Sequence, residues 1–293
     1  MDKAERNSLV AISVTLLVAA LVAIAGSQGG SIVFGLPLFA FCVILAFVIQ
    51  WVAFIPAFIY QTEQFYDLTG SITYLSLMAV AMVFSQAVGA RDYLLLTIVA
   101  IWSIRLGTFL FGRIRAAGED RRFRDIKPSF WRFLSAWTIQ GLWVSLTLAA
   151  ALAAITSAVK VELGFYALIG FLIWLVGFGV EVIADRQKSQ FRSDQANAGK
   201  FIQTGMWAWS RHPNYFGEIV LWIGVAIIAF PVLRGWQWLT MISPLFVSLL
   251  LTRVSGVPML ERRADDTWGG QPEYEAYKAS TPVLVPKPPA AAK

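Results

Sequence analysis

The sequence predicts an all-α membrane protein, a polytopic bundle of about seven to eight transmembrane helices. Of its 293 residues, 57% are hydrophobic and only 14% are charged, which is too apolar for a soluble protein of this length. The apolar residues form runs long enough to cross about 30 Å of hydrocarbon, and the cationic residues gather between these runs. These observations favour a chain that crosses a membrane several times.

Eight apolar runs are candidate spans. They cover about residues 9–25, 37–59, 71–88, 92–111, 133–156, 164–183, 216–231 and 237–252. The first run ends in the turn residues 26–30 and lacks a small-residue cleavage site, so we expect a retained span and not a signal peptide. The last two runs are short, and a tilted or re-entrant pair fits them as well as two full spans do. We interpret the Trp-rich stretches 131–143 and 236–238 as interface anchors.

The cationic residues predict the side that each connection faces. They are concentrated in 112–132, in 184–214 and after residue 252, which are cytoplasmic by the positive-inside rule. With eight spans, both termini are then cytoplasmic. The sparsely charged connections on the opposite side are 26–36, 89–91, 157–163 and 232–235. The cationic residues of these three connections account for the net charge of +6, so the net charge predicts no nucleic-acid partner.

Several kinds of site are excluded by composition and motif. One cysteine, Cys42, and one histidine, His212, cannot build a disulfide framework or a typical zinc or haem site, so we predict no metal. No glycine-rich dinucleotide or P-loop motif occurs, so any nucleotide must bind in a helical membrane cavity. The chain also lacks the Gly-x-Ser-x-Gly and His-Glu-x-x-His motifs of hydrolases.

The chain's single histidine lies in the segment 205–218, where we predict the chemistry. The same segment contains Arg211, Asn214, Tyr215 and Glu218. Arg211 and His212 can bind phosphate, and Pro213 favours the first turn of a helix whose free N–H groups attract anions. The alternative is an interfacial helix start with Arg and Trp anchors, but such an anchor does not require His, Asn and Glu so close together.

Four acidic residues lie at or near membrane depth, where a charge needs a partner or a polar cavity. They are Asp67, Glu181, Asp185 and Glu218. The spacing of Glu181, Asp185, Lys188 and Arg192 places them on one stripe of a helix that continues from the sixth span into the cytoplasm. The stripe is either a row of salt bridges or a surface that binds a nucleotide. Arg105, Arg253 and the loop 118–122 favour the second interpretation, because these cations suit a ligand with several phosphates.

Five groups of motif residues occur in a fixed order. They are Trp102-Ser-Ile-Arg105-Leu-Gly, Gly118-Glu-Asp-Arg121-Arg-Phe, Asp185-Arg-Gln-Lys188 with Phe191, Ser210-Arg-His-Pro-Asn-Tyr-Phe-Gly-Glu218, and Glu261 with Pro272-Glu-Tyr274-x-x-Tyr277 and Thr281 to Pro286. This order resembles the steroid 5α-reductase-like membrane family, specifically its bacterial branch, over about residues 60–287. Arg-His-Pro followed by Tyr also resembles isoprenylcysteine carboxyl methyltransferases.

The resemblance implies a multi-pass protein of the bacterial inner membrane that binds NADPH in a cytoplasm-facing cavity. It implies reduction of the C=C bond of an enone in a steroid-like or other lipid substrate, with no protein partner. By matching positions, the dinucleotide contacts are Asp185, Arg192, Asn214 and Arg253, supported by Arg105, Arg211, His212, Tyr215 and Glu218.

The sequence departs from the animal members of that family at the expected catalytic positions. Tyr66 and Asp67 stand where those members have a Gln-Glu pair, and Trp102 stands where they have a Tyr. Likewise Glu181 replaces a common Asn, and Val257 and Glu261 replace a His and a Tyr. Because Trp102 has no hydroxyl, polarisation of a substrate carbonyl passes to Asp67 or Tyr66. Asp67 in an apolar setting can stay protonated and donate that hydrogen bond. A helix N-cap is the alternative for Asp67, and an interfacial belt residue is the alternative for Tyr66.

The chain divides by sequence into three parts. We predict N-terminal transmembrane helices in 1–60, the reductase-like membrane domain in 61–287 and a disordered Pro-rich tail in 288–293. Two other functions stay open. An S-adenosylmethionine-dependent membrane methyltransferase would need fewer phosphate-binding cations, and a transporter or lipid-binding protein would carry its polar residues near the bilayer midplane.

Overall fold

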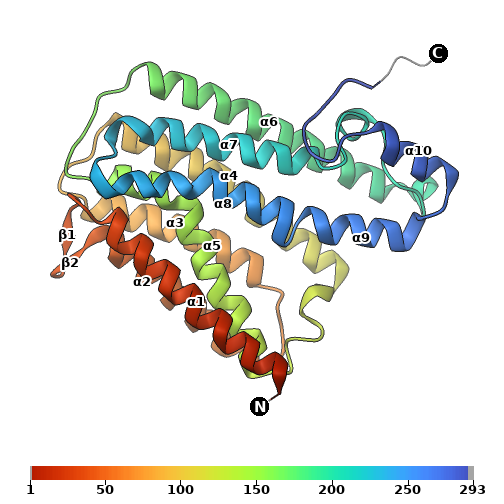
Figure 1. Ribbon diagram of the computed structural model, residues 1–293, viewed down its shortest axis with the longest axis horizontal. Helices are drawn as coiled ribbons and strands as arrows, with labels where there is room; N and C mark the ends of the chain where they lie inside the picture. Colours follow the sequence, from red (N-terminus) through yellow and green to blue (C-terminus); the bar gives the residue numbers. More distant parts are fainter. Residues whose placement is uncertain (1, 290–293) are drawn as a thin grey trace. The chain divides into compact units, whose positions relative to one another are not determined.

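The structure, a computed structural model, describes residues 2–289 and confirms the all-α prediction. Within these residues, β1 (Ile32–Val33) and β2 (Leu36–Pro37) are the only paired strands, a short antiparallel hairpin. The helices are α1 (Lys3–Gly26), α2 (Leu38–Ile59), α3 (Tyr66–Phe84), α4 (Ala90–Ala117), α5 (Phe130–Thr156), α6 (Phe165–Ser193), α7 (Pro213–Ala229), α8 (Ile242–Leu249), α9 (Val257–Trp268) and α10 (Pro272–Ser280). The chain's path through them is shown in Figure 1.

The prediction of eight spans is confirmed by length and composition. In the described part of the chain, eight helical segments are long and apolar enough to cross a membrane. The eighth, Gly235–Trp268, joins a 3₁₀ turn, α8, a π-helical turn (Leu250–Val254) and α9. Of the predicted tail, residues 290–293 lie outside the described residues.

Several helices extend beyond the apolar runs that mark them. α3 begins at Tyr66 and not near 71, because Asp67 in its first turn is stabilised by the positive end of the helix dipole. α4 ends at Ala117, past Arg113 and Arg115, since cations are favourable near a helix C-terminus. α6 continues to Ser193, as the spacing of its charged stripe predicts. α7 begins at Pro213, the expected first helical residue.

The chain folds into two compact units. Unit 1 comprises residues 1–167 and 226–243, and unit 2 comprises 168–225 and 244–293. In unit 1, α1, α2 and α3 all pack against α5, the light green helix of Figure 1. The side chains of Ala149 to Ala154 are fully buried, which permits close packing around α5.

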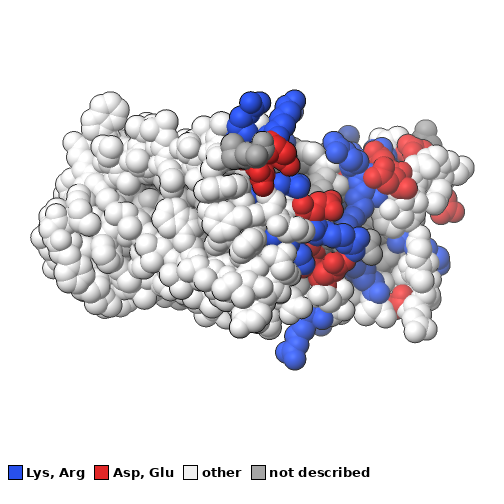
Figure 2. Space-filling view, turned by 90° about the horizontal axis from the view of Figure 1, so that it is seen from below, with Lys and Arg blue, Asp and Glu red and all other residues white. Residues whose placement is uncertain are grey.

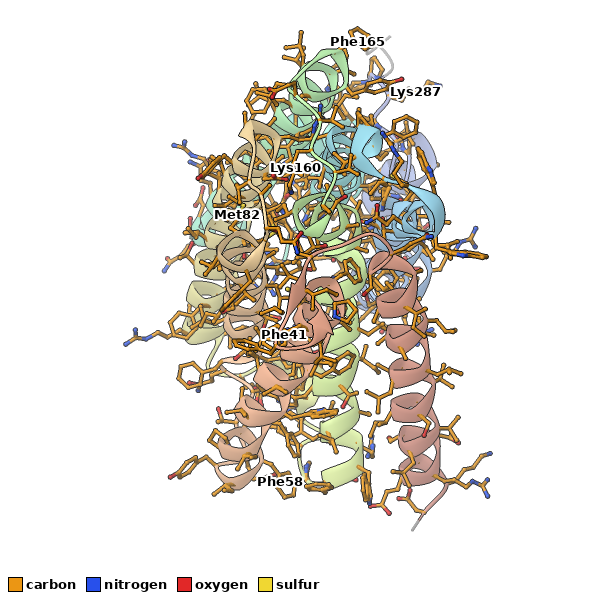
Figure 3. All side chains as sticks on the ribbon, turned by 90° about the vertical axis from the view of Figure 1, so that its left-hand side faces the viewer. Phe41, Phe58, Met82, Lys160, Phe165 and Lys287 are labelled. Atoms are coloured by element: carbon orange, nitrogen blue, oxygen red, sulfur yellow. The ribbon has the colours of Figure 1, made fainter. Side chains whose placement is uncertain are left out.

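A buried arginine joins three parts of unit 1. Arg91, at the start of α4, donates to the carbonyl oxygens of Ile228, Glu162 and Val161 at 2.6, 2.7 and 3.2 Å. Its neighbour Asp92 forms an ion pair of 3.0 Å with Lys160. In Figure 3, Lys160 lies toward the end of unit 1 that is opposite Phe58.

Glycines set the spacing of α6 and α7 in unit 2. A Cβ at Gly217 would lie 2.6 Å from the backbone N of Glu181 and from the carbonyl oxygen of Gly177. A Cβ at Gly177 would lie 2.4 Å from the backbone N of Leu221, and a Cβ at Gly224 would lie 2.5 Å from the carbonyl oxygen of Gly170. No larger residue fits at these crossings without moving a helix, so the two backbones approach closely and position their polar ends.

Candidate functional site

In unit 2, His212 and Arg211 meet one carboxylate. His212 Nε2 lies 2.7 Å from Glu261 Oε1, and Arg211 Nη1 lies 2.7 Å from Glu261 Oε2. Tyr215 stacks on the imidazole with a centroid distance of 5.7 Å and an interplanar angle of 11°. We call Arg211, His212, Tyr215 and Glu261 the His212 cluster. Sequence reasoning noted Glu261 among the motif residues and as a departure from the family pattern, but missed it as the partner of both Arg211 and His212.

The C-terminal segment fixes the backbone of this cluster. Arg211 N–H donates to the Pro282 carbonyl at 2.9 Å, and Lys287 N–H donates to the Trp209 carbonyl at 2.9 Å. The fully buried Ser210 hydroxyl donates to the Leu284 carbonyl at 2.8 Å and accepts from His212 N–H at 3.1 Å. The chain around His212 is therefore held on both sides before any ligand binds.

The surroundings of His212 favour its neutral imidazole form. Burial lowers its pKa below the usual value, and the cations Lys188 and Arg211 lower it further, against the opposing effect of Glu261. Because Nε2 faces a carboxylate oxygen, the ring proton sits on Nε2 and Nδ1 is an acceptor. Nδ1, like Arg211 Nε, is buried and has no hydrogen-bond partner among the described residues. The cluster thus contains one acceptor and one cationic donor that the described residues leave unpaired.

A second polar contact of unit 2 joins α6 to α7. Asn214 Nδ2 donates to Asp185 Oδ1 at 3.1 Å, and Asp185 is buried, as is Glu181 one turn earlier. On the same stripe, Lys188 lies 4.2 Å from the ring centroid of Trp207, whereas Arg192 is exposed. The stripe is therefore not only a row of solvated salt bridges, because its first two carboxylates are buried.

In unit 1, Asp67 and Tyr66 have defined partners. Phe65 occupies the N-cap position of α3 without a side-chain cap, and Asp67 lies in the first turn, so the N-cap alternative for Asp67 is wrong. The Asp67 carboxylate lies 3.6 Å from the guanidinium of Arg122. The Tyr66 hydroxyl donates to the Ala136 carbonyl at 2.9 Å, and its ring packs on Trp137. Tyr66 therefore belongs to a packed aromatic cluster and not to an interfacial belt.

The loop between α4 and α5 contains the segment 118–122 that the sequence indicated as phosphate-binding, and in the structure its charged residues bind one another and Glu63. Arg122 donates from Nε to Asp120 at 2.8 Å, and Asp120 N–H donates to Glu63 at 2.7 Å. Lys127 forms an ion pair with the same Glu63 carboxylate. Burial alone would raise the pKa of Asp120, but the hydrogen bonds and charge of Arg122 bring it below the usual value. These residues form a continuous charged chain that ends at Asp67.

Trp102 is buried at 2% exposure, and its ring meets Tyr74 edge to face at 5.1 Å and 89°. Tyr74 lies two turns along α3 from Tyr66, and it was not selected from the sequence. Arg105, one turn beyond Trp102, lies over the ring of Phe109 at 5.2 Å.

The predicted site residues thus fall into two groups. Unit 1 holds Tyr66, Asp67, Trp102 and Arg105, and unit 2 holds Asp185, Arg192, Arg211, His212, Asn214, Tyr215, Glu218 and Arg253. Within unit 2 the structure brings Arg211, His212 and Tyr215 together and joins Asp185 to Asn214. Glu218 is half-buried on α7, and Arg253 is exposed on the π-helical turn. No group of three or more His, Cys, Asp or Glu side chains in the described range is arranged to hold a metal ion.

Comparison with known proteins gives a family match and three curated relatives. The model of a family described as "Protein of unknown function (DUF1295)" matches residues 53–281. Over 120 residues the chain is 29% identical to 3-oxo-5-alpha-steroid 4-dehydrogenase 1 of Rattus norvegicus, covering 41% of this chain and 40% of that protein. The Mus musculus protein of the same name is 28% identical over 120 residues, or 41% of each chain.

The third relative is the Delta(14)-sterol reductase ERG24 of Saccharomyces cerevisiae, 40% identical over 72 residues, which cover 21% of this chain and 16% of that protein. The matches therefore span about two fifths of the rat and mouse relatives and less of the yeast one. No solved structure matches.

Proposed function

The chain belongs to the DUF1295 family, and from its resemblance to named steroid and sterol reductases we propose that it is an integral membrane NADPH-dependent reductase. Its reaction is reduction of the C=C bond of an enone in a steroid-like or other lipid substrate. The observation that carries this proposal is the buried His212 cluster, whose two unsatisfied polar atoms fit a polar ligand in a chain that is otherwise strongly apolar. The proposed location is the bacterial inner membrane, with both termini in the cytoplasm.

The residues of unit 2 fit a phosphorylated dinucleotide. Arg211 offers a guanidinium donor for a phosphate, and neutral His212 offers Nδ1 as an acceptor for an amide or hydroxyl donor. Buried Asp185, oriented by Asn214, is suited to accept from ribose hydroxyls. Arg192, Arg253, Tyr215 and Glu218 complete the proposed binding set, with Arg105 of unit 1. When bound, NADPH supplies the hydride.

The residues of unit 1 would bind the substrate carbonyl. As a hydride reaches the β-carbon of an enone, negative charge develops on the carbonyl oxygen and requires a positioned donor. The Tyr66 hydroxyl is already bonded to Ala136, so we assign the donor role to Asp67 in its protonated form, with the Arg122 cation beside it. Trp102 packs against Tyr74, so in this proposal it lines the site and does not donate a hydrogen bond.

A thermal-shift titration of the detergent-purified protein tests the cofactor assignment. A ligand that binds only the folded state stabilises it by about 2.7 kcal/mol at one hundred times its Kd. We expect a saturable rise of the Tm with NADPH, and no rise with S-adenosylmethionine. A rise with S-adenosylmethionine alone would instead establish a methyltransferase.

Variants of unit 2 locate the binding site in the same assay. Asn214→Ala and Asp185→Ala should remain folded but lose the NADPH-dependent shift. Asp266→Ala, an exposed carboxylate on α9, is the matched control and should keep it. If all three variants respond to NADPH as the parent does, the site assignment is wrong.

A further inference from the structure

Unit 1 carries cations at the ends of three of its membrane-spanning helices. They are Lys3 and Arg6 on α1, Arg115 on α4 and Arg132 on α5, and we call these four residues the cationic rim. Lys3, Arg6 and Arg115 are exposed, and Arg132 is half-buried. The reaction proposed above uses none of the four.

Hydrogen bonds hold these helix ends at the same end of unit 1. The Ser129 hydroxyl, at the start of α5, donates to the Glu5 carboxylate on α1 at 3.3 Å. The Gln64 amide, just before α3, donates to the Gly118 carbonyl at the end of α4 at 3.4 Å. The Tyr66 hydroxyl then joins the start of α3 to α5 at 2.9 Å. The rim cations therefore lie together at one end of unit 1.

On α1, two rim cations continue the exposed apolar face of the helix. Val10, Val14 and Leu17 are 58, 53 and 61% exposed, and their spacing of four and three residues places them on one face. Arg6 lies four residues before Val10 and Lys3 lies seven before it, so both share that face. Because α1 is long and apolar enough to span a membrane, this face contacts acyl chains, and the cations at its end lie near the headgroups.

The same relation holds on α4 and α5. Arg115 lies eleven residues after Ile104, which is 53% exposed, and Arg132 lies seven residues before Ile139, which is 40% exposed. Eleven residues make about three helical turns and seven make about two, so each cation shares a face with an exposed apolar side chain. Three different helices thus end an exposed apolar face with a cation.

Acidic residues at this end of unit 1 are engaged by other groups and not by the rim. Asp2 and Glu5 accept backbone N–H groups in the capping box of α1. The ion pairs of the adjoining loops are Glu63–Lys127, Glu119–Arg124 and Asp120–Arg122. None of the four rim cations forms an ion pair with another described residue. The rim therefore keeps an uncompensated positive charge.

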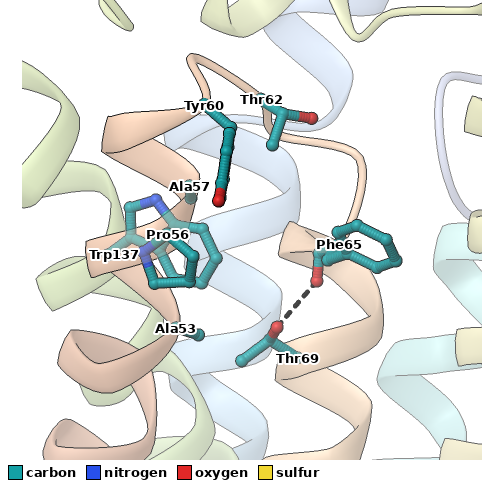
Figure 4. Close-up of a pocket in the computed structure, with 8 residues that line it drawn as sticks. All are labelled: Ala53, Pro56, Ala57, Tyr60, Thr62, Phe65, Thr69 and Trp137. Carbon is teal, nitrogen blue, oxygen red and sulfur yellow. Dashed lines mark hydrogen bonds between the residues drawn. The ribbon is translucent and has the colours of Figure 1, made fainter.

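The side of this end that α2 forms is uncharged. α2 contains no charged residue, and its exposed face ends at Ile59 and Tyr60, which are 66 and 77% exposed. The pocket between α2, α3 and α5 is lined by residues such as Pro56, Tyr60 and Phe65, and by no Lys, Arg, Asp or Glu (Figure 4). The positive charge is thus confined to the sides formed by α1, α4 and α5.

We propose that the cationic rim binds anionic phospholipids of the leaflet at this end of unit 1. The guanidinium and ammonium groups donate to the lipid phosphate, and the acyl chains lie along the exposed apolar faces below them. In a zwitterionic lipid the headgroup amine balances the phosphate charge, whereas an anionic lipid brings a net negative charge that each nearby Lys or Arg attracts. The proposal depends neither on the direction of insertion nor on the proposed reductase activity.

Native mass spectrometry of the full-length protein in detergent tests this surface without a turnover assay. The protein is titrated with phosphatidylglycerol and, separately, with phosphatidylcholine of the same acyl chains, and the bound lipids are counted. We expect phosphatidylglycerol to bind about tenfold more tightly or better. Arg6→Gln, Arg115→Gln and Arg132→Gln should each weaken its binding about fivefold and leave the binding of phosphatidylcholine unchanged.

Arg124→Gln is the matched control, because it removes the same charge from the same end, but Arg124 is paired with Glu119 and lies outside the rim. It should bind phosphatidylglycerol as the parent does. An equal loss in Arg124→Gln and in the rim variants would overturn the proposal, since net charge alone would explain the binding, and so would equal affinities of the parent for the two lipids. Displacement of phosphatidylglycerol by inorganic phosphate would also overturn it, by showing a site for free phosphate. If one glutamine variant does not elute as a monodisperse species, the other two decide.

Discussion

At the scale of single residues, the protein keeps a few ionisable groups in an apolar chain by giving them defined partners. Glu261 binds both the Arg211 cation and the neutral His212 ring, although it lies 49 residues beyond His212 in the chain. Arg122 likewise pairs with the carboxylates of both Asp67 and Asp120. Breaking such a pair by removing one member leaves the other buried and uncompensated, which is strongly destabilising. Conservative substitutions that retain volume and polarity are therefore the informative ones.

Neutral His212 predicts a loss of stability in mild acid. Its folded pKa lies below the unfolded value of about 6.5, so below that pH the unfolded chain binds the proton more readily. The stabilising contribution is complete above the unfolded pKa and is lost as the pH falls toward the folded pKa. The Tm of the parent should fall relative to that of His212→Gln between pH 8 and pH 5.5. Parallel pH profiles of the Tm for the two proteins would contradict this prediction, because His212 would then have the same pKa in the folded and the unfolded chain.

Substitution of Asp67 should separate turnover from cofactor binding. If Asp67 donates to the developing enolate oxygen, Asp67→Asn should lower kcat on the order of 10²-fold, the usual range for one positioned proton donor. The Kd for NADPH should not change. Asp125→Asn, an exposed carboxylate in the same region, serves as the control for loss of charge. An unchanged kcat in Asp67→Asn would leave Asp67 with only its ion pair to Arg122.

Some residue-level features were predictable from the sequence, and others were not. Pro213 at the first position of α7 follows from its fixed φ and its missing N–H, and the structure confirms it. The placement of Glu261 beside His212 depends on the path of the chain between α7 and α9, which no local pattern specifies. Trp137 was interpreted as an interface anchor, but it is buried, because α5 is surrounded by three other helices of unit 1. Trp236, 67% exposed, is compatible with the anchor interpretation.

At the scale of helices, hydropathy locates each span but not its ends. α3, α4 and α6 all extend into polar sequence, because helix formation there is supported by dipole-compatible charges and by packing. What sets the separation of neighbouring helices is residue size at the crossing. In unit 2 that role belongs to Gly177, Gly217 and Gly224, as expected for helices that associate in lipid.

The α6–α7 crossing predicts a sharp difference between two glycines. A Cβ at Gly217 would lie 2.6 Å from backbone atoms, whereas a Cβ at Gly179 on α6 meets nothing within 4 Å. Gly217→Ala should therefore destabilise the protein by about 1–3 kcal/mol through overpacking, and it should weaken NADPH binding by displacing Asn214 from Asp185. Gly179→Ala should be neutral or stabilising by up to about 1 kcal/mol, since alanine favours the helix. Thermal unfolding of both variants checks this, and equal Tm values would show that the helices can separate without cost.

At the scale of the whole molecule, the distribution of charge along the chain decides how it sits in a membrane. In Figure 2, the Lys, Arg, Asp and Glu side chains gather in one region of the face shown, and much of that face is uncharged. Composition alone predicted the helical class and eight candidate spans, because length and hydropathy are properties of the sequence. The positive-inside rule and the contrast between connections such as 118–129 and 157–164 predict the direction of insertion.

Cysteine accessibility in cells tests that direction. The chain has a single native cysteine, Cys42, which is fully buried, so an added cysteine will dominate labelling by a membrane-impermeant maleimide, and a Cys42→Ala background removes what remains. Arg124→Cys in the cationic connection between α4 and α5 should be labelled only after the inner membrane is permeabilised, because cationic connections stay in the cytoplasm. Val159→Cys, in the sparsely charged connection after α5 and 44% exposed, should be labelled while the inner membrane is intact. The reverse labelling pattern would mean that the protein has the opposite orientation in the membrane. The His212 cluster would then lie away from the cytoplasmic supply of NADPH that the proposed reaction requires.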